Sequence, residues 1–300
     1  MPYRPFPLPH RETAEKRRGR RAIAGVGVLL ASVTALSSLG TLGAAPAAAA
    51  TSSGRGDVPA GSLAPVQPPG KARLTAAVLD MDSTGREPTV YGDDTPYDTA
   101  SIVKVDILAA VLLQAQDAGR PLTAQERAQA EAMIQRSDNA SANALWRRIG
   151  QGPGLEAANK RLGLTSTKGG PGPRWGLTRT TASDQIRLLR AVFGTSPASH
   201  AGSTTLNEAS RSYIRRLMTR IVADQAWGVS AAADSGWALK NGWLQRNTTG
   251  LWDVNSVGQV MVGGHRYLVA VLSDGDTSMK DGISLVERAA RTAVSSASSR

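Results

Sequence analysis

Hydrophobic residues at both ends of the chain follow patterns that favour strands. Residues 74–79 and 88–91 are short apolar runs on either side of a turn-like Asp-Ser-Thr-Gly sequence. Later in the chain, three more strands are expected over 238–244, 251–262 and 267–273, because apolar residues dominate there and glycine-containing turns separate them. We expect these three strands to be antiparallel neighbours.

The middle of the chain has the periodicity and the end signals of helices. Residues 101–116 are apolar nearly all round, which indicates a buried helix. Thr123-Ala124-Gln125-Glu126 has the form of a capping box and predicts a helix that leads to Ser137. A long Gly/Pro-rich stretch at 163–180 predicts a functional loop. Further helices are expected over 139–149, 155–162, 181–193, 207–224 and 279–294.

The order of these elements predicts an α/β fold. An antiparallel sheet with flanking helices would be built from both termini, and an all-α lobe would be inserted between them. We place the α/β lobe at 72–100 and 230–300, and the all-α lobe at 101–229. Residues 51–71 are rich in Ser, Gly and Pro, which is typical of a flexible linker before the domain of residues 72–300.

The first fifty residues have the composition of an export signal. A basic cluster precedes an uncharged stretch that ends in small residues, so we expect cleavage near Ala50 and a secreted, extracytoplasmic protein. The Arg20-Arg21 pair favours the twin-arginine route. The alternative is an uncleaved membrane anchor, since the uncharged run is long enough to span a bilayer.

Charge and composition exclude several classes of function. Much of the net charge of +11 lies in this leader, and residues 51–300 carry only +6. Aromatic residues are 4% of the chain and do not interleave with a basic stripe, so nucleic-acid binding is not expected. The absence of cysteine rules out disulfides and thiolate chemistry. The three histidines are far apart and no G-x-S-x-G sequence occurs, so neither a metal site nor a Ser-His-Asp triad is predicted.

The strongest chemical signal is Ser101-Ile102-Val103-Lys104, at the start of the apolar helix. The i, i+3 spacing places Lys104 on the same face as Ser101, and a desolvated lysine is able to take the proton of a serine nucleophile. The positive end of the helix dipole would stabilise a developing oxyanion there. The structural alternative is that Ser101 only caps the helix while Lys104 extends to solvent.

Two further motifs gain meaning from their order. Ser137-Asp138-Asn139 alone is a helix break followed by an N-cap, and Lys240-Asn241-Gly242 alone is a strand segment. Together with Ser-x-x-Lys, in this order and spacing, they resemble the signature of penicillin-recognising serine enzymes. The chain is similar to class A β-lactamases and to D-alanyl-D-alanine peptidases over roughly residues 72–298, which implies a β-lactamase/transpeptidase-like fold.

The resemblance implies a role for each catalytic residue. Ser101 would be the acylated nucleophile and Lys104 its proton partner. Ser137 would pass a proton to the leaving nitrogen, and Lys240 would attract the carboxylate of the substrate. A cation at Lys240 would also help to keep Lys104 neutral by like-charge repulsion.

The resemblance also implies a substrate-binding set. Asn139 would bind the side-chain amide of the substrate, and Gly242 would let the substrate lie along the strand. The backbone N–H groups of Ser101 and Trp243 would form the oxyanion hole. Asn241 stands where the family usually has Thr or Ser, and Trp243 is a bulky residue after the glycine.

Two other departures concern whole segments. The segment between Ser101 and Ser137 is short for class A, so we expect one wall of the cleft to be trimmed. Class A enzymes also carry a deacylating glutamate in the following loop. Its place falls near Pro173, yet no carboxylate occurs between Glu156 and Asp184, and Asp184 itself reads as the capping acid of the next helix.

The leading prediction is therefore a secreted, monomeric serine hydrolase that acylates on β-lactams with slow turnover. Its partner would be a small-molecule β-lactam or a D-Ala-D-Ala peptidoglycan fragment, with no cofactor and no membrane span after cleavage. A D-alanyl-D-alanine peptidase-like cell-wall hydrolase is the alternative enzyme. A ligand-binding protein on the same fold is the non-enzymatic alternative.

Overall fold

The computed structural model of the protein describes residues 66, 68, 70–83, 87–194 and 205–299. The expected export signal and most of the expected linker lie outside these residues. The description below concerns the unit that residues 58–300 form.

A five-stranded antiparallel sheet combines strands from both ends of the domain. Its order is β2-β1-β7-β6-β5. The early strand β1 thus pairs directly with the last strand, β7, while β2 and β5 form the two edges. The strands span β1 (Arg73–Asp80), β2 (Thr89–Tyr91), β5 (Trp237–Gln245), β6 (Trp252–Val262) and β7 (His265–Asp276).

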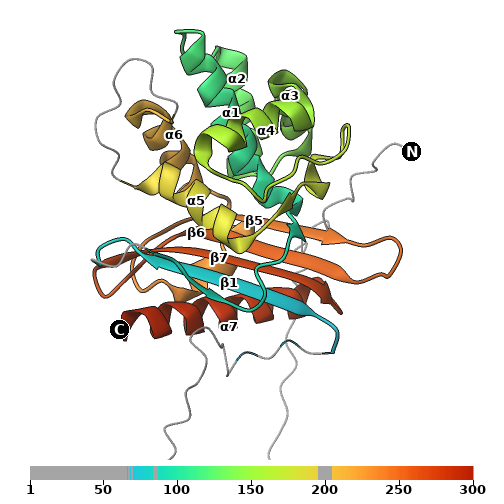
Figure 1. Ribbon diagram of the computed structural model, residues 1–300, viewed down its shortest axis with the longest axis vertical. Coiled ribbons are helices and arrows are strands. Elements are labelled where there is room, and N and C mark those ends of the chain that lie inside the picture. The colour runs from blue at the N-terminus through green and yellow to red at the C-terminus, as the bar shows by residue number, and fades with distance from the viewer. Residues whose placement is uncertain (1–65, 67, 69, 84–86, 195–204, 300) are drawn as a thin grey trace, which may run out of the picture. The chain divides into compact units, whose positions relative to one another are not determined.

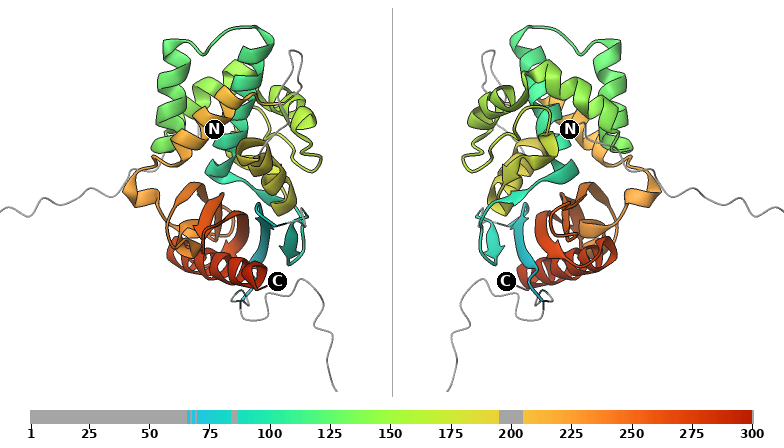
Figure 2. Two further views of the ribbon diagram at one scale, coloured as in Figure 1. Left: turned by 90° about the vertical axis from the view of Figure 1, so that its left-hand side faces the viewer. Right: turned by 90° about the vertical axis from the view of Figure 1, so that its right-hand side faces the viewer.

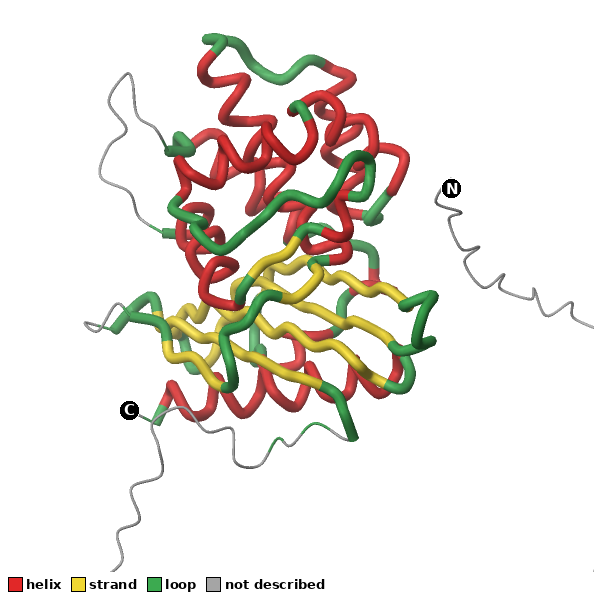
Figure 3. The backbone as a smooth tube through the Cα atoms, turned by 45° about the vertical axis from the view of Figure 1, so that its right-hand side comes forward, coloured by secondary structure: helices red, strands yellow, loops and turns green. Residues whose placement is uncertain are grey.

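The sheet lies between the inserted helices and the last helix, as Figures 1 and 2 show, and it separates two apolar layers. Alternation along β7 sends Leu268 and Leu272 into the core shared with the inserted helices, and Val269 and Val271 into the core shared with the last helix. Figure 3 shows the sheet between the inserted helices and the last helix. The predicted fold class, a sheet built from both termini with an inserted all-α lobe, is confirmed.

Helix α1 is buried almost all round at the centre of the helical layer, as its apolar sequence predicts. The predicted capping box opens α2, where Thr123 and Glu126 exchange side-chain and backbone hydrogen bonds. The helices span α1 (Val103–Asp117), α2 (Ala124–Gln135), α3 (Asn139–Ile149), α4 (Gln151–Leu162), α5 (Ala182–Phe193), α6 (Glu208–Met218) and α7 (Met279–Ser298). Among the described residues, no helix is both long and apolar enough to cross a membrane.

The structure corrects some predicted boundaries. Helix α4 begins at Gln151 rather than Leu155, because Pro153 lies in the first turn, where its missing N–H costs nothing. Helix α6 ends at Met218 rather than at 224. The predicted loop 163–180 contains a short strand, β4 (Arg179–Thr180), which pairs with β3 (Tyr97–Asp98) just before the Ser-x-x-Lys motif.

Candidate active site

Ser101 lies in the tight turn that joins β3 to α1. The 3-10 turn η1 (Ala100–Ile102) leads directly into α1, and Ala100 has a positive φ of 46°. Such a conformation is strained for a residue with a side chain and persists only where its surroundings hold it. Thr99 N–H donates to the carbonyl of Thr178 at 2.9 Å, so the loop before β4 secures the turn on one side.

Asn255 on β6 secures the turn on the other side. Its side-chain amide donates to the carbonyls of Asp98 (2.9 Å) and Thr99 (3.2 Å), and its oxygen accepts from Ser273 N–H at 3.2 Å. Asn255 is fully buried. It therefore positions the nucleophile turn, although nothing in the sequence around it indicates this.

Strand β5 lies against the same turn at Gly242. A Cβ on Gly242 would lie 2.6 Å from the backbone nitrogen of Ser101 and 2.7 Å from the carbonyl oxygen of Thr99. Only glycine allows this approach of two backbones. The nitrogen of Ser101 is thereby brought beside the residue that precedes Trp243.

Lys104 is completely buried one turn after Ser101. Its side-chain nitrogen lies within hydrogen-bond distance of the Ser137 carbonyl (2.6 Å), the Ser137 hydroxyl (2.9 Å) and Asn139 Oδ1 (2.8 Å). Burial lowers the pKa of Lys104 well below its ordinary value, and the charge of Lys240 lowers it further, while Asp138 opposes them. The solvent-directed alternative for Lys104 is therefore wrong.

Lys240 approaches the same hydroxyl from the sheet. Its nitrogen donates to Ser137 Oγ at 3.0 Å and to the Asn241 carbonyl at 2.9 Å. Burial lowers the pKa of Lys240 to about 7. Among the described residues, no carboxylate forms a hydrogen bond with either lysine, so this pair of buried amines is suited to an anionic ligand.

In the Ser-Asp-Asn motif, Ser137 and Asn139 contact the lysines of the site, and Asp138 caps a helix. Ser137, at a positive φ of 55°, turns its hydroxyl to both lysines. Asp138 caps α3 by accepting from Ser141 N–H at 2.7 Å. Asn139, the first residue of α3, turns its oxygen to Lys104. The motif therefore both caps a helix and places polar side chains at the two lysines.

Asn241 and Trp243 direct their side chains away from Lys240. The Asn241 amide donates to the carbonyls of Gln225 (2.8 Å) and Trp227 (2.9 Å). The Trp243 ring packs beside that of Trp227, with 5.9 Å between centroids. Residues that alternate along a strand face opposite sides of the sheet, so contacts of these two residues with a substrate would come from their backbones.

Sequence reasoning missed Trp175, which lies in the 3-10 turn η2 (Trp175–Leu177) of the loop. The nitrogen of Lys104 lies 4.8 Å from the centroid of the indole ring. The indole N–H donates to Asn143 Oδ1 at 2.7 Å, which fixes the ring to α3. A lone large aromatic residue in a loop of Gly, Pro and basic residues was the available signal.

The loop supplies no acid to the site. Asp184, at its far end, is fully buried and accepts from Ser166 N–H and from the Thr167 hydroxyl, both at 2.8 Å. Its own N–H donates to Thr181, which confirms it as the acid at the third position of α5. Asp184 is therefore engaged in holding the base of the loop.

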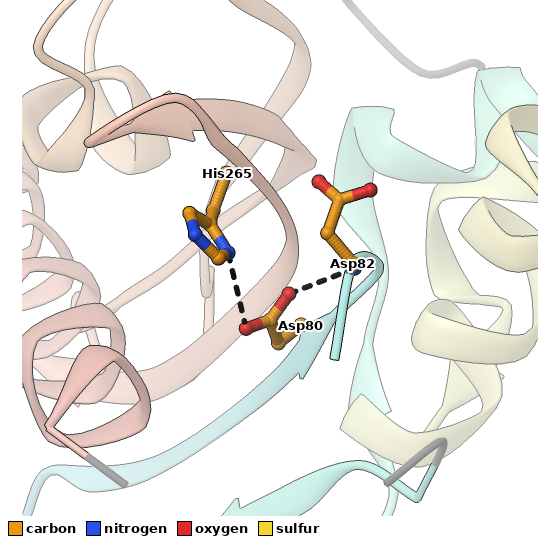
Figure 4. A group of neighbouring side chains, drawn as sticks. All are labelled: Asp80, Asp82 and His265. Carbon is orange, nitrogen blue, oxygen red and sulfur yellow. Dashed lines mark hydrogen bonds and ion pairs between the residues drawn. The ribbon is translucent and has the colours of Figure 1, made fainter. Parts of the chain in front are cut away.

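A second group of titratable residues lies elsewhere, where β1 ends and β7 begins (Figure 4). Asp80, Asp82 and His265 are near enough to one another to share a metal ion. His265 is the first residue of β7 and lies 3.7 Å from Asp80. Asp82 is already paired with Arg266, whose cation disfavours a metal there. This group shares no residue with the site.

Comparison with known proteins agrees with this arrangement. Residues 121–297 match the model of the Beta-lactamase2 family, described as the beta-lactamase enzyme family. No curated protein matches the chain.

Solved structures of similar fold include three informative examples. TLA-3 extended-spectrum beta-lactamase is 15% identical, with a TM-score of 0.65, and the match covers 76% of this chain and 94% of that one. A beta-lactamase from Chitinophaga pinensis is 17% identical, with a TM-score of 0.63 and coverage of 78% and 96%. A mutant of PBP-A, in acyl-enzyme complex with penicillin G, is 22% identical, with a TM-score of 0.60 and coverage of 76% and 91%.

At these identities the solved structures show a shared fold. The family match spans more than half of the chain and includes the Ser-Asp-Asn and Lys-Asn-Gly segments. The chain belongs to the beta-lactamase enzyme family.

Proposed function

We propose that the protein is a secreted serine hydrolase that forms an acyl-enzyme at Ser101 with β-lactams or related amides and releases it slowly. The observation that carries this proposal is the convergence of two buried lysines on Ser137 Oγ, at 2.9 Å for Lys104 and 3.0 Å for Lys240. Lys104 itself follows Ser101 by one helical turn. A structural helix cap would need neither lysine.

The acylation step follows from these contacts. Ser101 Oγ attacks the amide carbonyl, and its proton passes to the neutral amine of Lys104. The new C–O bond leaves an oxyanion, for which the N–H groups of Ser101 and Trp243 are the proposed donors. As the C–N bond breaks, the leaving nitrogen takes a proton from Ser137, which regains one from Lys104.

Substrate choice rests on charge. Lys240 is buried and has no carboxylate partner among the described residues, so an incoming carboxylate would restore its charged form and gain a hydrogen bond. Asn139 keeps its amide nitrogen for the side chain of the substrate, because its oxygen is engaged by Lys104. Both β-lactams and D-Ala-D-Ala peptides carry such a carboxylate and such an amide.

A cell-wall peptidase remains the second candidate, because the described loop residues 165–180 hold no carboxylate to activate water. Export near Ala50, a monomeric state and a peptidoglycan partner belong to this proposal as well. Export rests on the leader, and the peptidoglycan partner rests on the charge of the site.

The proposed function is tested by the early time course of a chromogenic β-lactam. Mature protein should consume the compound in a burst equal to the amount of enzyme, followed by a slow phase. The Ser101→Ala variant should give no burst. Consumption without a burst in the wild-type protein, or a burst in the variant, would refute it.

A further inference from the structure

The surroundings of Lys104 are polar on one side and aromatic on the other. Lys104 meets polar atoms of Ser137 and Asn139 on one side, and its other near neighbour is the flat face of Trp175. Trp175 is only 6% exposed, so the indole is part of the buried interior beside Lys104 and does not lie on the surface above it.

The indole is held firmly. Its N–H is used by Asn143, and Thr178 N–H closes the turn on the Trp175 carbonyl at 3.0 Å. The same segment is tied to the nucleophile turn by the bond from Thr99 N–H to the Thr178 carbonyl. Earlier in the loop, the Gly172 carbonyl accepts from Trp146 at 2.8 Å. The ring therefore cannot turn away without losing its bond to Asn143, and the loop segment that carries it cannot move without breaking several further hydrogen bonds.

The aromatic side of Lys104 matters for the second half of the reaction. Hydrolysis of the Ser101 ester needs a water molecule near the ester carbonyl and a group that accepts its proton. Ring carbons offer a water molecule no conventional hydrogen bond, and leaving a polar molecule unpaired in a buried place is costly. A water molecule is therefore disfavoured on this side of Lys104.

We propose that Trp175, fixed by Asn143, determines the reaction specificity of the site by keeping water from the acyl-enzyme, so that the ester at Ser101 is long-lived. This inference rests on the proposed function and adds to it the residue that limits hydrolysis. The indole acts by occupying space, and the missing loop carboxylate is a separate deficiency. Replacing Trp175 should therefore speed hydrolysis even when no acid is introduced.

The test measures the loss of a preformed adduct. Wild-type protein, Trp175→Gln, Trp175→Phe and Asn143→Ala are acylated with penicillin, freed from excess compound and followed by intact mass. Trp252→Gln is the matched control, because Trp252 is a partly buried indole packed against the other core. The rate of acylation of each variant is measured separately.

The Trp175→Gln adduct should decay about tenfold faster than wild type or more, because a polar side chain and a vacated volume admit water. Asn143→Ala should increase the rate by less, and Trp175→Phe and Trp252→Gln should stay near wild type. Decay is measured on adduct that has already formed, so a change in the acylation rate of the Trp175 variants does not enter it. Acylation of Trp252→Gln should match wild type.

Unchanged decay in Trp175→Gln would overturn the inference while leaving the proposed function intact. Loss of acylation in both Trp175 variants would also overturn it, by assigning the indole to the first step. If wild-type protein forms no adduct, the proposed function fails, and the inference that rests on it fails too.

Discussion

Gly242 and Ser101 are in backbone contact: a Cβ on Gly242 would lie 2.6 Å from the Ser101 nitrogen. The Ser101 nitrogen and the Thr99 oxygen that this Cβ would meet cannot move easily, because both are main-chain atoms and Asn255 also holds the turn. The Lys-Asn-Gly segment thus supplies two things at once, the amine of Lys240 and the surface against which the nucleophile turn rests.

This contact predicts a large effect of Gly242→Ala. Acylation by a β-lactam should fall about 100-fold or more, because a displacement on the order of 1 Å at the nucleophile is costly. Gly236→Ala is the control, since its Cβ would meet only the flexible Met261 side chain at 3.5 Å. Stopped-flow acylation rates check this. Similar rates for the two variants would show that the turn tolerates the displacement.

The buried amine of Lys240 predicts a dependence on substrate charge. Lys240→Ala should slow acylation by a carboxylate-bearing β-lactam by the equivalent of about 2–4 kcal/mol, and slow an uncharged ester substrate much less. Lys160→Ala, an exposed lysine on α4, serves as the control. Equal losses for both substrates would mean that Lys240 is only structural.

The pKa of Lys240 also predicts how kcat/KM changes on the alkaline side of its pH profile. Because the pKa of Lys240 is about 7 in the free protein, its charge is present below that pH and is lost as the pH rises through it. For carboxylate-bearing substrates, kcat/KM should therefore fall above about pH 7. The uncharged ester should lack this fall, and Lys240→Ala should abolish it. A fall that persists in Lys240→Ala would assign it to another group.

Asp106 predicts a pH dependence of stability that is separate from catalysis. It is fully buried on α1 with no hydrogen-bond partner for either carboxylate oxygen in the part of the chain described. Burial raises the pKa of Asp106 from 3.8 to about 7, and the negative charge of Asp184 adds to this. The folded chain thus keeps a proton here that the unfolded chain gives up.

An acid whose pKa is raised by folding stabilises the fold fully below its unfolded pKa, and this contribution is lost as the pH rises through its folded pKa. Between about pH 4 and pH 7, wild type should therefore lose stability relative to Asp106→Asn, by on the order of 2–4 kcal/mol. Urea unfolding of both proteins across this range checks it. A constant difference would show that Asp106 is ionised in the folded state.

The sequence predicts the fold well where its signals are local. The capping box of α2, the apolar helix α1 and the cap of α5 are each specified by residues within a few positions of one another. The family resemblance that the three motifs carry also implied that Lys104, Ser137 and Lys240 would share one site, and they do meet.

Other features depend on contacts that no local pattern encodes. Trp175 stacks on Lys104, and Asn255 donates a hydrogen bond to the Thr99 carbonyl. Both contacts join segments that are far apart in the sequence. The pairing of β3 with β4 involves two residues on each strand, too few for a period to be visible. The direction of the Asn241 side chain follows from register on the edge strand, which depends on the whole sheet.

The most direct test of the proposed chemistry is intact-mass measurement of the mature protein during incubation with a penicillin. We expect the mass to increase by one penicillin per chain, the adduct to map to the peptide that contains Ser101, and the labelled form to persist. Ser101→Ala should remain unlabelled under the same conditions. Labelling that survives in Ser101→Ala, or a wild-type protein that never acquires the added mass, would contradict it.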